Sequence, residues 1–229
     1  AAQPVQATPP APASGAAVPA KPITDPYGAA RPEAKTVITS AQGLVAAGQW
    51  KKAWDSLAAF DAASADPYIL ALKIQLCLKG YVQTDAHLSF ALVDLAAGES
   101  LLALREAGDR GNLVDFDPFG AVQAISEATP ELPPVLLLAL GDYCYDVQAL
   151  YADKWQVGEE EVCSVALSSY EEAQKGGLAT ADSLRRQGDL LLRFSRNDEA
   201  EASIRASLAL EPGNLDTKKS LAVALAQAN

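Results

Sequence analysis

A triplet of residues that recurs along the chain constrains the fold more than any other feature. Each triplet begins with alanine, continues with a large residue four positions later, and ends with a small or apolar residue three positions further on. The five triplets are Ala53, Leu57, Phe60; Ala86, Phe90, Val93; Ala121, Ile125, Ala128; Ala166, Tyr170, Ala173; and Ala200, Ile204, Ser207. Their first members are separated by 33, 35, 45 and 34 residues. Because positions i, i+4 and i+7 share one helix face, each triplet predicts a seam between packed helices, and the spacing indicates repeated helical hairpins.

The residues between the triplets also favour helices. From residue 37 onward, apolar side chains recur at intervals of three and four, and Gly or Pro interrupts the pattern at points such as Gly48, Pro67, Pro130 and Pro212. Strand-like alternation is absent over any useful length. The sequence therefore predicts an all-α protein.

The first 36 residues have a different composition. They hold eight of the 14 prolines and many alanines, with Ile23 and Tyr27 as the only bulky apolar residues between Val18 and Val37. Such a segment buries too little surface to offset its chain entropy, and its prolines favour extended conformations. We expect residues 1–36 to form a disordered Ala/Pro-rich tether and residues 37–229 to form the folded part.

Charge and hydropathy argue against two classes of partner. The net charge is -11, and the basic dipeptides, such as Lys51-Lys52, are isolated, so a nucleic acid is not an expected partner. The apolar run 135–140 lies between Pro134 and Gly141 and is far shorter than a bilayer crossing requires. We expect no transmembrane segment, and any membrane association would go through a partner or the N-terminal tether.

No catalytic, cofactor or metal site is expected. The three cysteines form no Cys-x-x-Cys pair, and His87 is the only histidine, so a zinc site lacks ligands. His87 also has no nucleophile elbow nearby, and the chain has no phosphate-binding glycine loop. The acidic loop 109–117 lacks the ligand spacing of an EF-hand. Only the paired carboxylates Asp142 and Asp146 leave an enzyme as an open alternative.

The repeats resemble the tetratricopeptide repeat (TPR) family. The best match is residues 181–214, where seven residues stand at signature positions of the family: Leu184, Gly188, Leu191, Ala200, Ile204, Ser207 and Pro212. Residues 134–175 match a repeat with an unusually long hairpin, and residues 99–133 match a degenerate repeat whose first helix is shortened to 99–107. The resemblance implies a right-handed superhelical solenoid of about five hairpins. It ends in a capping helix, 216–228, which is expected to present one polar face.

In the TPR family, partners bind to the concave surface lined by the first helix of each repeat. Carried over by position, the resemblance implies a partner-binding surface made of Leu138, Asp142, Tyr145, Asp146, Arg185, Asp189, Leu192 and Arg193. An aromatic ring between carboxylates, beside arginines, can hold an extended peptide by stacking and charge-assisted hydrogen bonds. Alternatively, these groups pair with one another, as Arg185 and Asp189 can at a spacing of four.

The resemblance implies a non-catalytic scaffold or assembly factor that binds a protein or peptide partner within a cell-envelope complex. The alternative is a periplasmic TPR protein that binds a small ligand for a solute transporter, with the long hairpin around Trp155 walling an apolar pocket. The opening Ala-Ala-Gln-Pro is typical of the residues found after a cleaved export signal. We therefore expect a periplasmic or outer-membrane-associated location.

Overall fold

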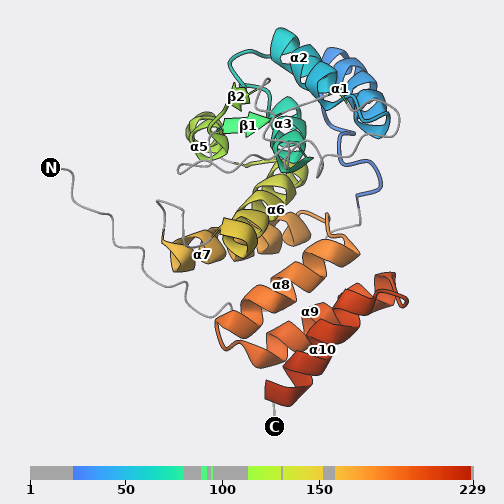
Figure 1. Cartoon of the computed structure of the whole chain (residues 1–229), viewed down its shortest axis with the longest axis vertical. Coiled ribbons are helices and arrows are strands. Elements are labelled where there is room, and N and C mark those ends of the chain that lie inside the picture. The colour runs from blue at the N-terminus through green and yellow to red at the C-terminus, as the bar shows by residue number, and fades with distance from the viewer. Residues whose placement is uncertain are drawn as a thin grey trace, which may run out of the picture.

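The computed structural model describes residues 23–79, 89–91, 94, 113–129, 131–151 and 158–227. These residues are mostly helical, as the sequence predicts, and one continuous apolar core runs through the helices (Figure 1). The elements are α1 (Pro32–Ala46), α2 (Trp50–Phe60), α3 (Pro67–Lys79), β1 (Ser89–Ala91), β2 (Leu113–Asp115), α5 (Pro118–Ala128), α6 (Pro134–Tyr151), α7 (Glu159–Lys175), α8 (Ala181–Arg193), α9 (Asn197–Leu210) and α10 (Leu215–Gln227). Within the described ranges, no helix combines the length and apolar content that a membrane crossing needs.

Among helices that follow one another, the most extensive packing joins three antiparallel pairs: α1 with α2, α6 with α7, and α8 with α9. The second of these pairs occupies the residues of the long hairpin, and the third those of the repeat at 181–214. Helix α6 also packs on α3, so it lies inside the molecule between two groups of helices. This central position of α6 decides which of its side chains reach the surface.

The seams of the last two hairpins are completely buried. Ala166 and Tyr170 of α7 are completely buried, and a Cβ atom at Gly141 of α6 would lie 2.8 Å from the Tyr170 ring. Ile204 of α9 lies in the same way against Gly188 of α8. In both hairpins a glycine lets a large side chain of the following helix approach the backbone closely.

The other triplets follow the prediction only in part. In the first, Ala53 and Leu57 are buried, but Phe60 at the end of α2 is 38% exposed. In the third, Ile125 is buried and Ala128 is exposed. The triplet pattern identifies the buried helix face correctly, but its last residue, at the end of each of these shorter helices, is exposed.

A small antiparallel β-ribbon corrects the prediction of helix throughout. Strands β1 and β2 pair with Phe90 opposite Val114, and an isolated bridge joins Gln49 to Asp94. Phe90 belongs to the second triplet, so the helical seam predicted there is wrong at this residue. A partner strand far along the chain supplies the hydrogen bonds, and such non-local pairing can override a local helical pattern. The short helix predicted at 99–107 lies outside the described residues.

The prediction of a tether over residues 1–36 is wrong for residues 23–36, and residues 1–22 lie outside the described part. Helix α1 begins at Pro32, at the position where proline costs a helix no hydrogen bond. Before it, the Ile23 amide donates to the Gly177 carbonyl (2.9 Å), and the Tyr27 hydroxyl donates to Gln75 (3.2 Å). Arg31 forms an ion pair with Asp66 (3.0 Å). A few anchors thus order a segment whose average composition favours disorder.

Candidate functional site

Five of the eight residues predicted to bind a partner lie together where α6 meets α8. They are Asp142, Tyr145, Asp146, Arg185 and Asp189, and all are half-buried. With Asp182 and Arg186 of α8 they form a continuous polar surface, which we call the α6–α8 face. It comprises Asp142, Tyr145, Asp146, Asp182, Arg185, Arg186 and Asp189.

Arg186 holds the α6–α8 face together. Its guanidinium bridges two carboxylates of α6, with Nη1 at 3.0 Å from Asp142 Oδ1 and Nη2 at 3.1 Å from Asp146 Oδ1. The same group stacks over the Tyr145 ring, 4.9 Å from its centroid, and Nε lies 3.4 Å from Asp182. Only 15% of the Arg186 side chain is exposed. Asp142 and Asp146, the paired carboxylates on which the enzyme alternative rests, therefore share the guanidinium of Arg186.

A second set of contacts surrounds Asp189. Arg185 Nη1 donates to Asp189 Oδ2 (2.8 Å), and the Tyr145 hydroxyl donates to the same oxygen (3.0 Å). Arg185 also pairs with Asp182 (2.9 Å). The pairing of Arg185 with Asp189, which the sequence offered as an alternative to peptide binding, is thus present. A partner at this face would meet charges that are already oriented.

Three of the eight predicted residues lie elsewhere. Leu138 is buried in the core, because α6 packs against both α3 and α7, so Leu138 does not line a binding surface. Leu192 is half-buried against the core. Arg193 pairs with Glu159 of α7 (2.6 Å), which also accepts a hydrogen bond from Gln148 (2.9 Å). These hydrogen bonds lower the pKa of Glu159.

The environment of Asp142 disfavours its ionised form. Burial raises the pKa of Asp142 to about 6, although the Arg186 charge and a hydrogen bond from Tyr170 (2.8 Å) oppose the rise. Burial also raises the pKa of Asp146. Desolvation thus outweighs a direct ion pair at this position, as is common for buried charges.

This shift predicts a specific pH dependence. The folded chain holds the Asp142 proton more tightly than the unfolded chain, so this group's contribution to the free energy of unfolding falls as pH rises from 3.8 to about 6. We expect the stability of Asp142→Asn relative to the natural chain to rise by about 2 kcal/mol across this window. Urea denaturation at pH 4 and pH 7 measures the difference.

Asp216 on α10 is the matched control for this experiment. The hydrogen bond from Lys219 lowers the pKa of Asp216, so the relative stability of Asp216→Asn should move in the opposite direction with pH. A relative stability of Asp142→Asn that does not change with pH would contradict the assignment.

Sequence reasoning missed Arg186, Asp182 and Tyr170 as members of the polar cluster. One signal was present: Asp142 and Asp146 are four residues apart, so they share one face of α6 and attract a cation between them. Two adjacent arginines, 185 and 186, point about 100° apart on a helix. Only one of the two arginines can therefore lie on the same side of α8 as Asp189, and the other then points toward the carboxylates of α6.

The cysteines and the acidic loop, which are the other reactive groups considered in the sequence, contribute to the core and to a helix cap. Cys77, Cys144 and Cys163 are free and buried, and burial raises the pKa of all three thiols. Asp117, at the end of the acidic loop, caps α5 by accepting from the Gly120 amide (3.0 Å). His87 and Trp155 lie outside the described residues. In the described ranges, no group of three or more potential ligand residues could hold a metal ion.

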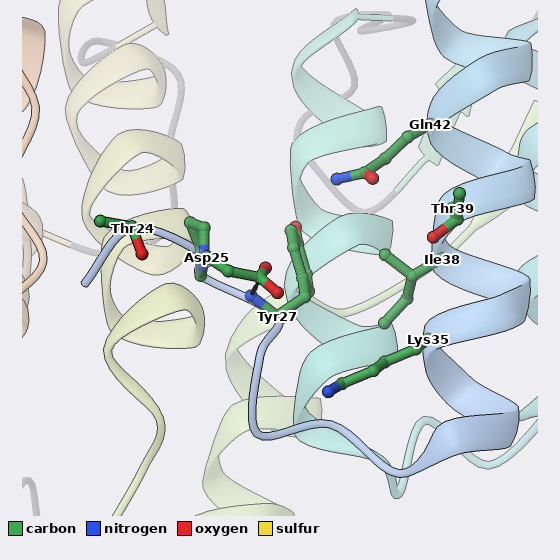
Figure 2. A pocket seen from close by; sticks show the side chains of 8 residues that line it. Thr24, Asp25, Tyr27, Lys35, Ile38, Thr39 and Gln42 are labelled. Carbon is green, nitrogen blue, oxygen red and sulfur yellow. Dashed lines mark hydrogen bonds between the residues drawn. The ribbon is translucent and has the colours of Figure 1, made fainter.

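A cleft of about 340 Å³ with a mixed polar and apolar lining lies between the segment before α1 and α1 itself (Figure 2). Asp25 comes from the segment, where it accepts a hydrogen bond from the Tyr27 amide (3.0 Å), and Lys35, Thr39 and Gln42 project from α1. Charges of both signs and neutral donors thus face one opening.

A comparison of the chain with protein-family models, with curated proteins and with solved structures finds no match. The geometry of the described residues is therefore the basis for the functional interpretation.

Proposed function

We propose that this chain is a non-catalytic, TPR-like helical array that binds a protein or peptide partner within a complex of the cell envelope. The proposal includes the finer features of the array, namely the right-handed solenoid and the repeated hairpins. Two observations support it: the seams of α6–α7 and α8–α9 are built alike, around Gly141 and Gly188, and the first helices of these hairpins share one polar face.

The convergence of α6 and α8 on the α6–α8 face is the observation that carries the proposal. Arg186 and Arg185 hold the carboxylates in place, so binding would cost little side-chain entropy at this surface. Tyr145 adds an aromatic ring that is half-buried and fixed at its hydroxyl by Asp189. Preorganised charges and a fixed ring suit recognition of an extended segment better than a mobile surface does.

The charge of the face indicates the chemistry of the partner. The face has four carboxylates, from Asp142, Asp146, Asp182 and Asp189, and two guanidiniums, from Arg185 and Arg186. Its net negative charge matches that of the whole chain and favours a partner segment that carries lysine or arginine. The excess carboxylates would bind the partner's cations, and Tyr145 would stack against its side chains.

Capture of a partner by the purified chain from solubilised cell envelopes, measured by quantitative mass spectrometry, tests the proposal. Asp182→Lys makes the α6–α8 face less negative at an exposed position, and we expect it to reduce recovery of a stoichiometric partner about tenfold. Asp198→Lys, at an exposed position on α9, is the matched control and should leave recovery unchanged. Equal recovery with both variants would contradict the assignment of the face.

The cleft in Figure 2 favours a second candidate function, the binding of a small solute. Lys35 and Asp25 offer opposite charges to a zwitterionic molecule, and Thr39 and Gln42 offer neutral hydrogen bonds. If this function is correct, organic extraction of the native protein should release a bound metabolite, and Lys35→Ala should reduce the amount. Recovery of a protein partner without any extracted molecule would favour the scaffold.

A further inference from the structure

Helix α10 repeats helix α8 at a spacing of 34 residues. The face that α8 turns toward the preceding helices includes Ser183 and Leu190, both buried, and the corresponding residues Thr217 and Ala224 are the buried residues of α10. A hydrogen bond between Ser207 and Thr217 (3.2 Å) fixes α10 against α9. Helix α10 therefore docks on the preceding hairpin in the way that α8 docks on its own predecessor.

The opposite face differs sharply between the two helices. In α8 this face comprises Ala181, Leu184 and Gly188, and α9 covers it. The corresponding residues of α10 are Leu215, Lys218 and Ala222, and all three are exposed. Leu215 is 69% exposed and the neighbouring Val223 48%, whereas Ala181 is 5% exposed. The outer face of α10 therefore combines exposed apolar side chains with the exposed Lys218.

The residues of this face indicate what would cover it. Ala222 takes the place of Gly188, where α9 inserts Ile204. Because a Cβ atom at that position would lie 2.4 Å from the Ile204 side chain, a helix that covers Ala222 must carry a smaller residue opposite it. Lys218 takes the place of the buried Leu184. A helix that covers Lys218 must offer a carboxylate there, because a buried ammonium without a partner is costly.

We propose that the outer face of α10, made of Leu215, Lys218, Ala222 and Val223, binds an acidic amphipathic helix of another protein. The binding helix packs on α10 in the place that corresponds to that of α9 on α8, and it does not contact the α6–α8 face. A second copy of α10 fits poorly, because α10 carries Lys218 and Lys219 against the single carboxylate Asp216, which already binds Lys219 (2.8 Å). Two such faces would bring together lysines without carboxylates opposite them.

Peptides based on α9 can test the proposal with the full chain. In the α8–α9 seam, Ser203 donates to the Leu184 carbonyl (2.8 Å), so position 203 of a bound α9-like helix would lie beside Lys218. We would use two fluorescent peptides of residues 196–211, both with Ile204→Ala to leave room for the Ala222 methyl group, one with Ser203→Glu and one with Ser203→Lys, and measure binding by anisotropy. The Glu peptide should bind the natural chain at least fivefold more tightly, and Lys218→Glu in the protein should reverse this preference.

Two further variants separate the proposed face from other surfaces. Ala222→Arg places a large charged side chain in the middle of the face and should abolish binding, whereas Ala202→Arg, at an exposed position on α9, should leave it unchanged. Circular dichroism checks that both variants fold. Absence of binding, equal affinity of the two peptides, or no reversal in Lys218→Glu would overturn the proposal. Self-association of the natural chain that Ala222→Arg abolishes would instead assign the face to a second copy and would also overturn it.

Discussion

Replacement of Tyr170 by alanine is expected to lower the free energy of unfolding by about 3–5 kcal/mol. Tyr170 is one of the largest completely buried side chains, and its ring packs against Gly141 on the neighbouring helix. Its removal would leave a cavity at the α6–α7 seam and take away the hydrogen bond to Asp142 (2.8 Å). Urea denaturation followed by circular dichroism measures the loss.

Tyr170→Phe separates the two contributions. It keeps the ring and removes only the hydroxyl that donates to Asp142, so the expected loss is about 1 kcal/mol. If the alanine and phenylalanine variants lose equal stability, the ring does not fill the seam as described.

Replacement of Gly188 by leucine is expected to lower the free energy of unfolding by about 3 kcal/mol, in spite of leucine's better helix propensity. Even a Cβ atom at this position would collide with the Ile204 side chain and lie 3.2 Å from the Ala200 carbonyl oxygen. Because Ile204 is completely buried, neither helix can move aside without disturbing the core. Thermal and urea denaturation would both report the loss.

Gly43 provides the matched control. It also lies inside a helix, α1, but an added Cβ atom there would meet open space. Gly43→Leu should change stability by less than about 1 kcal/mol, in the stabilising direction, because leucine favours helix more than glycine does. A similar loss in both variants would mean that backbone flexibility, rather than close packing, explains the glycine at position 188.

The parts of the fold that could be predicted from sequence depend on residues close together in the chain. Ala166 and Tyr170, and likewise Ala200 and Ile204, are four residues apart, so helical periodicity alone places them on one buried face. The same periodicity groups Asp142 with Asp146 on α6. It cannot show that Arg186 lies between their carboxylates, because that contact depends on how two helices cross.

Most of the missed features depend on contacts between residues that are far apart in the chain. Phe90 forms a strand because Val114 lies opposite it. Lys73 stands in an apolar helix and is buried there, because the carbonyl of Asp61 and the hydroxyl of Ser64 accept its hydrogen bonds. Burial lowers the pKa of Lys73. Local patterns carry no information about such partners, so no single segment could have revealed them.

The hydrogen bond between Ile23 and Gly177 has a consequence for how the chain unfolds. Linear arrays lose order from either end, because each unit touches only its neighbours. Here Ile23 is hydrogen-bonded to Gly177 in the loop between α7 and α8, so unfolding of the segment before α1 would also remove a contact that holds this loop. Local unfolding of the segment before α1 is therefore coupled to local unfolding of the loop between α7 and α8. Proteolytic cleavage between residues 23 and 31 would be expected to loosen that loop, although the two sites are far apart in the chain.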